Sequence, residues 1–214
     1  MIWLARAEPD MAHALRHGLR DAYDWHKAAW QCFPHEPDAR RDFLTRLDPP
    51  QAGMRHCRFW LLSGRCPQRP DWCPPESWGI KRVAPGFLGH ELYRFDLLAN
   101  PCRKLRAAEA DGRRGKNSRR KALTRREEQL DWLRRKAAQH GFQLLEEQEG
   151  ANVEIFPAEN HHFSKAGEHG LIVGVRFRGL LRVVERQAFA EAFARGIGSA
   201  RAFGFGLLML EPLR

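Results

Sequence analysis

The sequence predicts an α+β protein, because some stretches alternate apolar and polar residues as strands do, and others repeat apolar residues with helical spacing. From residue 90 onward these patterns follow one another as strand, helix, two strands, helix and strand, which is the ferredoxin-like order. The pattern before residue 90 is less regular. With 43% hydrophobic residues, the 214-residue chain can form one large core or two small ones.

The first part of the chain alternates short apolar stretches with turn residues. We expect strands at 2–5, 43–47 and 58–62, helices at 9–17 and from 21 to about 33, and a proline-rich loop at 66–75. Asp21 is a good N-cap for the second helix, and Asp24 three residues later can complete a capping-box-like arrangement. This part therefore predicts an irregular mixture of helices and strands.

The second part has clearer periodicity. We expect strands at 92–98, 142–146, 152–156 and 205–210, a long strand or hairpin at 171–184, and helices at 122–139 and 188–194. The polar stretch 161–169 is expected to be a loop between strands. A boundary near residues 85–89 divides the chain into domains 1–88 and 89–214.

Positive charge is concentrated in one segment. The chain has a formal net charge of +10, and residues 103–126 carry eleven lysines and arginines against Glu109 and Asp111, a net of +9. A concentrated basic block predicts a partner rich in phosphate, and nucleic acid fits best. A charged loop without a ligand is the alternative, because blocks of like charge are often linkers.

The segment GIGSARAFGFG, residues 196–206, is a glycine-rich basic loop that leads into an apolar strand. Its glycines can adopt positive φ and let a polyanion approach backbone N–H groups, which suits phosphate. A dinucleotide-binding turn would need a strand before the glycines and a helix after them, and here the order is reversed. A purely structural turn between helix and strand is the alternative.

The cysteines and carboxylates exclude several classes of site. Five cysteines without a C-x-x-C pair predict reduced thiols, although Cys57, Cys66 and Cys73 could in principle hold a metal with His56. Paired carboxylates and a P-loop are absent, which argues against two-metal nucleases and NTPases. We therefore expect no metal and no cofactor. No apolar run reaches the length of a membrane span or a signal peptide, which predicts a cytoplasmic protein without a membrane partner.

Tyr23 and His26 lie one helical turn apart near the start of the second helix, where free backbone N–H groups favour phosphate. Histidine can transfer protons near neutral pH. Together with Lys165 the pair supplies the acid, base and cation needed for a ribose 2′-hydroxyl to attack its neighbouring phosphodiester, so RNA and not DNA is the expected substrate. Simple packing beside Trp25 and Trp30 is the alternative for the pair.

Three stretches carry a resemblance to a known family: DAYDWHKAAWQCFP at 21–34, YRFDLLANPCRK at 93–104, and the segment 177–210 that ends in the glycine-rich loop. The chain resembles the CasE-type CRISPR RNA-processing endoribonucleases of type I-E systems, within the RAMP superfamily. The resemblance implies two tandem ferredoxin-like domains, of which the N-terminal one is irregular here. It also implies cleavage of the CRISPR repeat hairpin in precursor RNA, and retention of the product in the Cascade complex with its other subunits.

The resemblance also assigns roles to residues. Tyr23 and His26 match the catalytic tyrosine and histidine, and Lys165 matches the lysine that stabilises the phosphorane, a role that His161 or His162 could take instead. The chain departs from the family at Ala22, Arg201 and Phe205, where proline, lysine and cysteine are frequent. The residues expected to bind RNA are Arg103, Lys104, Arg113, Arg114, Lys116, Arg119, Arg120, Lys121, Gly196, Gly198, Ser199 and Arg201. The rival functions are a non-catalytic RNA-binding subunit of the same superfamily and a basic scaffold protein of a nucleoprotein particle.

Overall fold

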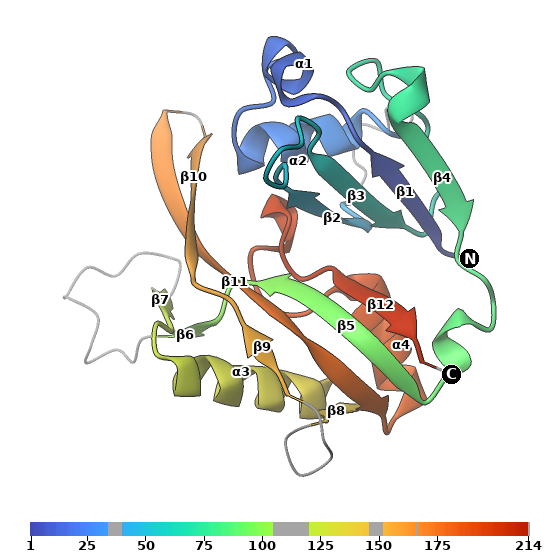
Figure 1. The fold of residues 1–214 in the computed structure, drawn as a ribbon, viewed down its shortest axis with the longest axis vertical. Coiled ribbons are helices and arrows are strands. Elements are labelled where there is room, and N and C mark those ends of the chain that lie inside the picture. Colours follow the sequence, from blue (N-terminus) through green and yellow to red (C-terminus); the bar gives the residue numbers. More distant parts are fainter. Residues whose placement is uncertain (34–39, 105–119, 146–151, 166, 214) are drawn as a thin grey trace.

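The computed structural model describes residues 1–33, 40–104, 120–145, 152–165 and 167–213. Two antiparallel sheets form two lobes that lie one above the other in Figure 1. The first lobe carries a four-stranded sheet of order β2-β3-β1-β4. Its elements are β1 (Trp3–Ala7), α1 (Met11–Arg16), α2 (Ala22–Trp30), β2 (Phe43–Asp48), β3 (Arg58–Ser63), the 3-10 turn η1 (Pro75–Ser77) and β4 (Trp78–Arg82).

The second lobe carries a six-stranded sheet whose main path is β10-β11-β5-β12. Its elements are the 3-10 turn η2 (Phe87–Gly89), β5 (Leu92–Ala99), α3 (Arg126–Gln139), β8 (Phe142–Leu144), β9 (Glu154–Ile155), β10 (Glu159–Lys165), β11 (Glu168–Val183), α4 (Arg186–Arg195), the 3-10 turn η5 (Arg201–Phe203) and β12 (Leu208–Pro212). A separate pair, β6 (Cys102–Lys104) and β7 (Arg120–Ala122), projects from it.

Both sheets have the ferredoxin-like strand order, in which the first strand lies between the third and the fourth. In the second lobe the place of the second strand is taken by three short strands, because β8, β9 and β10 pair with successive parts of β11. In the first lobe a proline-rich loop with the turn η1 stands where a second helix would be. The predicted α+β class and the irregular first domain are therefore confirmed.

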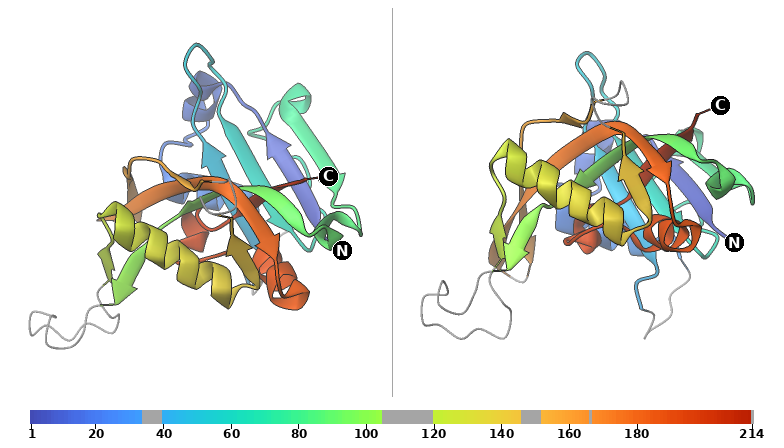
Figure 2. Two further views of the ribbon diagram at one scale, coloured as in Figure 1. Left: turned by 60° about the horizontal axis from the view of Figure 1, so that its bottom comes forward. Right: turned by 90° about the horizontal axis from the view of Figure 1, so that it is seen from below.

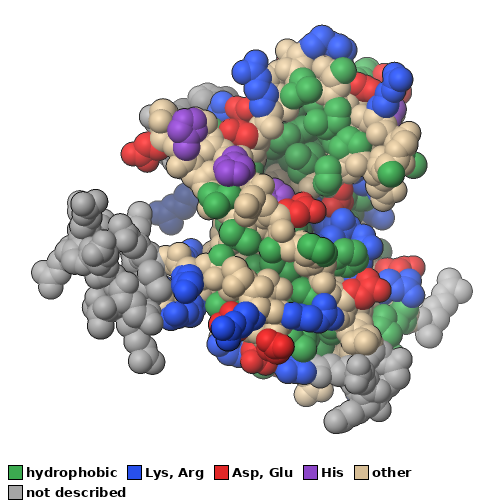
Figure 3. Space-filling model, turned by 60° about the vertical axis from the view of Figure 1, so that its left-hand side comes forward, with side chains coloured by type: hydrophobic (Ala, Val, Ile, Leu, Met, Phe, Trp, Pro, Cys, Tyr) green, Lys and Arg blue, Asp and Glu red, His purple; other side chains and the backbone are tan. Residues whose placement is uncertain are grey.

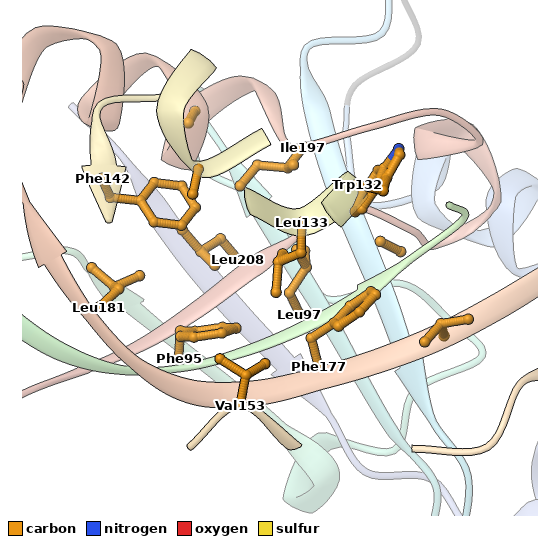
Figure 4. Packing of buried hydrophobic residues seen from close by; sticks show 14 of the residues in the cluster. Phe95, Leu97, Trp132, Leu133, Phe142, Val153, Phe177, Leu181, Ile197 and Leu208 are labelled. Carbon is orange, nitrogen blue, oxygen red and sulfur yellow. The ribbon is translucent and has the colours of Figure 1, made fainter. Parts of the chain in front are cut away.

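The core of the second lobe lies between its sheet and the helices α3 and α4, which cover the same face (Figure 2). Tyr93, Phe95 and Leu97 alternate along β5 toward these helices and are buried. Figure 4 shows their neighbours Trp132 and Phe177 packed around the same centre. Period-two alternation thus directs one face of β5 into the core and leaves Asp96 on the opposite face.

The second lobe meets the first through a small apolar cluster and through a group of charges on the sheet face that carries Asp96. Leu44 and Leu62 of the first lobe pack with Phe193 and Leu207 of the second. Beside them lies the interlobe ion cluster, which consists of Arg46, Asp48, Asp96, Arg176 and Arg178.

Asp96 is the centre of the interlobe ion cluster. The Arg46 guanidinium, whose side chain is 2% exposed, lies 2.9 Å from Asp96 Oδ1 and 2.8 Å from Asp48 Oδ1. Arg176 and Arg178 donate to Asp96 Oδ2 at 2.6 and 2.8 Å. Burial opposes ionisation of Asp96, but Arg176 and Arg46 outweigh it and lower the pKa of this carboxyl to about 2.

Several sequence expectations need correction. The stretch 161–169 is not a loop, because β10 and the start of β11 form an antiparallel hairpin there. Of the two alternatives for 171–184, the long strand is confirmed, because β11 runs from Glu168 to Val183. The third helix begins at Arg126 and not at 122. The strands β4, β6 and β7 were not expected. The strands β6, β7 and β10 are polar, so their sequences lack the apolar alternation that indicates a strand. They form because another strand supplies their hydrogen-bond partners.

The described cysteines are free, and three of them belong to the core. Burial raises the pKa of Cys32 to about 12 and those of Cys57 and Cys73 to about 11, so these thiols stay protonated at neutral pH. Within the described ranges, no three His, Cys, Asp or Glu side chains come together in a way that could hold a metal. None of the described helices is both long and apolar enough to cross a membrane.

Candidate functional site

The first turn of α2 is fixed by two carboxylates. Asp21 Oδ1 accepts hydrogen bonds from the backbone N–H groups of Tyr23 at 2.8 Å and of Asp24 at 3.0 Å, so the predicted N-cap is confirmed. Asp24 Oδ2 accepts from the N–H of Arg20 at 3.2 Å, one residue before the position that a capping box uses. The turn that carries Tyr23 and His26 therefore has a defined start.

Tyr23 and His26 share one surface of α2, as the sequence predicts. Their ring centroids are 6.4 Å apart. The half-buried His26 ring also lies 6.4 to 6.5 Å from the rings of Trp30, Phe43 and Phe203. Phe203 belongs to the glycine-rich loop, so that loop reaches the helix that carries the candidate catalytic pair. The aromatic neighbours restrict the imidazole and are compatible with both packing and catalysis.

The glycines of the loop adopt the predicted backbone conformation. Gly196, Gly198, Gly204 and Gly206 all have φ between 78° and 88°. At Gly206 a Cβ would also lie 2.5 Å from the Ile197 carbonyl oxygen, so only glycine fits. Gly196 is buried and donates its N–H to Ala192, so its observed role is to end α4, and an RNA contact by Gly196 stays a prediction.

Asn100 holds the loop against the second sheet. The Ser199 hydroxyl donates to Asn100 Oδ1 at 2.9 Å, and Asn100 Nδ2 donates to the Val173 carbonyl at 2.8 Å. The loop, the end of β5 and the β11 strand are thus joined through one side chain. This contact gives a structural reason for the Asn-Pro stretch in the family resemblance.

A groove of about 530 Å³ lies along the loop and is lined by several basic side chains. It is lined by Gly198 and Ser199 and by five basic side chains, which we call the basic groove: Arg41, Lys104, Arg120, Lys136 and Arg201. Arg41 Nη1 donates to the Arg201 carbonyl at 2.9 Å, and burial together with the charge of Arg201 lowers the pKa of Arg41. A cluster of positively charged side chains favours the binding of an anion such as phosphate.

Sequence reasoning missed two members of the basic groove. Arg41 lies just before β2, more than 150 residues from Arg201, and Lys136 belongs to α3. Their contribution depends on tertiary contacts. The outward face of α3 offered a partial signal for Lys136, and no local signal marked Arg41.

A second hollow of about 320 Å³ lies between α2, the loop and β10. Asp21, His161, His162 and Phe203 are among its lining residues. Burial lowers the pKa of His161, more than Glu159 at 3.9 Å raises it, so the neutral imidazole is favoured near pH 7. Figure 3 shows a group of histidine side chains on this side of the molecule, near the junction of the lobes. Phe203 separates this hollow from the basic groove, because it lines both.

Comparison with known proteins places this arrangement in a family. The model of a family described as CRISPR associated protein matches residues 2–212. The chain belongs to this family. The resemblance that the sequence suggested is therefore confirmed.

Curated and solved relatives of this CRISPR-associated protein agree. The Cascade subunit CasE of Escherichia coli is 31% identical over 202 residues, which cover 91% of this chain and 94% of that protein. The endoribonuclease Cse3 of Thermus thermophilus is 27% identical and covers 99% of this chain and 100% of its own length. A structure of Cse3 from this organism, bound to an RNA that represents a pre-cleavage complex, matches with a TM-score of 0.76 at 26% identity and 99% coverage of both chains.

The remaining candidate residues of this CRISPR-associated protein lie in β6, β7 and β10. Arg103 faces Lys121 and Lys104 faces Arg120 across the exposed β6–β7 pair. Like charges directly opposite one another repel, and a bound anion would compensate this repulsion. Such an arrangement is therefore expected at a site that binds phosphate. Lys165 is the last residue of β10, and its backbone lies opposite that of Glu168 in β11. The side chain of Lys165 is outside the described part. Outside the described residues lie Arg113, Arg114, Lys116 and Arg119.

Proposed function

We propose that this CRISPR-associated protein is an endoribonuclease that cleaves the repeat hairpins of precursor CRISPR RNA and keeps the product as a Cascade subunit. The observation that carries the proposal is the contact of Phe203 with His26, which brings the catalytic pair of α2 beside the basic groove. An RNA strand in the groove would then present a phosphodiester near an imidazole and a phenol. The names of the relatives, an endoribonuclease and a Cascade subunit, support the same function.

The chemistry follows from the ribose 2′-hydroxyl. Its oxygen attacks the adjacent phosphorus while its proton passes to a base, and the bond from phosphorus to the 5′-oxygen breaks as that oxygen receives a proton. The products are a 2′,3′-cyclic phosphate and a 5′-hydroxyl. In this proposal His26 acts as general acid or base, Tyr23 positions it or the hydroxyl, and Lys165 stabilises the charged phosphorane. No metal is needed in this proposal, because His26 takes part in proton transfer and Lys165 supplies the positive charge.

We also propose the cellular and domain context. The chain consists of domains 1–88 and 89–214, since the strands of the first sheet end at Arg82 and those of the second begin at Leu92. The protein works in the cytoplasm, where precursor RNA is available and its thiols stay reduced.

The direct test uses labelled repeat RNA in the presence of EDTA, beside a copy with one deoxynucleotide at the cut site. We expect cleavage of the first RNA and none of the second, because the deoxy copy lacks the nucleophile. Loss of activity in the chelator, or equal cleavage of the deoxy copy, would contradict the mechanism. Binding without cleavage would favour the non-catalytic subunit, and equal competition by unrelated RNA would favour the scaffold protein.

A second prediction concerns the basic groove. Neutralising Lys104 and Arg120 together to glutamine should weaken hairpin binding and flatten the dependence of log Kd on log salt by about one unit for each phosphate that is no longer neutralised. The measurement is a titration of labelled hairpin at several salt concentrations. The matched control is the double change Arg6→Gln and Arg58→Gln, which removes two exposed arginines that pair with Glu8 in the first lobe. If both double variants show the wild-type slope, Lys104 and Arg120 do not contact the RNA.

A further inference from the structure

The two carboxylate oxygens of Asp21 have different partners. Oδ1 caps α2 through the N–H groups of Tyr23 and Asp24, as described above. Oδ2 accepts a hydrogen bond from the backbone N–H of Ser164 at 2.8 Å, which belongs to β10, more than 140 residues further along the chain. A single side chain therefore starts the helix of the catalytic pair and also holds the edge strand of the second sheet.

The surroundings of Ser164 reinforce this contact. The neighbouring Phe163 ring lies 4.4 Å from the Phe203 ring, centroid to centroid, so β10 also touches the glycine-rich loop. Across the hairpin Phe163 faces Gly170, where a Cβ would be 2.1 Å from the ring. The absence of a side chain at Gly170 lets the Phe163 ring lie across the hairpin. Figure 1 shows the β10–β11 hairpin rising from the second sheet beside α2.

We propose that Asp21 is a positioning residue for RNA cleavage, which clamps the end of β10 onto the first turn of α2. The inference rests on the proposed function. Lys165 follows Ser164 in the chain, so the clamp fixes the backbone of the candidate phosphorane-stabilising residue relative to Tyr23 and His26. These groups come from two lobes, and Asp21 Oδ2 is a direct polar link between their two elements.

Cleavage by an intramolecular nucleophile is sensitive to such placement. Catalytic groups must meet the same phosphodiester, and a shift of about 1 Å can cost on the order of 100-fold in rate. Binding of the RNA hairpin depends on many phosphate contacts spread over the basic groove, so RNA affinity is less sensitive to the position of β10. Loss of the clamp should therefore affect the cleavage step more than RNA affinity.

The cap and the clamp can be separated by substitution. Asp21→Ser keeps one oxygen that can cap the helix, because serine is as good an N-cap as aspartate, but it lacks the second oxygen for Ser164. Ser164→Pro removes the donor N–H and leaves Asp21 untouched. β10 is the edge strand and this N–H points away from β11, so proline is tolerated there. Ser164→Ala is the matched control, because it changes the side chain and keeps the N–H.

The experiment measures single-turnover cleavage, hairpin Kd and thermal unfolding for these variants. Asp21→Ser and Ser164→Pro should each cut about 10- to 100-fold more slowly, with Kd within about two-fold of wild type and an unfolding midpoint near the wild-type value. Ser164→Ala should behave as wild type. Asp21→Ala loses the cap as well, and its unfolding midpoint should fall by about 2–4 °C.

Other outcomes would overturn the proposal. If the wild type cuts and both Asp21→Ser and Ser164→Pro cut equally fast, the clamp positions nothing. If their rates fall only in proportion to the drop in affinity or in stability, Asp21 has a structural role alone. If the wild type does not cut the hairpin at all, the proposed function itself fails and the clamp fails with it. That last pattern is distinct from the other two.

Discussion

His26→Ala is expected to reduce cleavage of the repeat hairpin by about 10²- to 10⁴-fold, the usual contribution of a general acid or base. Hairpin affinity should remain close to the wild-type value, because in the proposed mechanism the imidazole acts in the transition state and the basic groove holds the phosphates. The measurement is a single-turnover rate constant at saturating protein, with Kd from a separate binding titration. A split between rate and affinity is the signature of a catalytic residue.

Two variants serve as controls for this prediction. Tyr23→Phe keeps the ring near His26 and removes only the hydroxyl, so it should lower the rate without changing Kd. His56→Ala removes an exposed imidazole in the first lobe and should leave both quantities unchanged. Equal losses of rate and affinity in His26→Ala would show that the ring only packs against Trp30, Phe43 and Phe203, which is the alternative that the sequence left open.

Asp96→Ala is expected to destabilise the fold by about 3–5 kcal/mol, the cost of breaking a buried ion pair from one side. The change removes the partner on β5 of the Arg46 guanidinium, whose side chain is 2% exposed. Arg176 and Arg178 also lose the carboxylate that compensates their charges. The measurement is urea denaturation, analysed for the free energy of unfolding. The matched control is Glu211→Ala, which breaks the exposed pair with Arg94 and should cost less than about 1 kcal/mol.

The same carboxylate predicts an acid limit to stability. The pKa of Asp96 is about 2 in the folded protein and about 3.9 in an unfolded chain. The folded state therefore binds fewer protons, and the stabilisation by ionised Asp96 is complete above about pH 5 and is lost progressively as the pH falls through the folded pKa of about 2. Wild type should lose more stability over this interval than Asp96→Ala does. Parallel pH profiles for the two proteins would show that Asp96 contributes no such linkage.

Local rules predicted the parts of the site that depend on local structure. Asp21 was recognisable as an N-cap because its side chain bonds to residues two and three positions ahead. The positive φ angles at the four glycines of the loop followed from glycine itself. The alternation along β5 gave its buried face directly. In each case the residues that determine the structure lie within a few positions of one another.

The parts that the sequence did not reveal depend on distant contacts. β10 is a polar edge strand that forms only because β11 supplies its hydrogen-bond partners, so its composition indicated a loop. The basic residue Arg46 gives no sign of burial until Asp96, 50 residues away, is placed against it. The clamp between Asp21 and Ser164 is likewise visible only once the two lobes are assembled.

The glycine-rich loop has an evolutionary consequence, because residues of the first lobe help to shape it. Gly196 lies so close to Leu44 of β2 that a Cβ would come within 2.9 Å of that side chain, and Arg41 bonds to the Arg201 carbonyl. A change in β2 would thus disturb a loop that is more than 150 residues away in the chain. Segments 41–46 and 196–206 should therefore vary together among homologues, and a hybrid that joins the lobes of two divergent relatives should lose the loop conformation unless both segments come from the same parent.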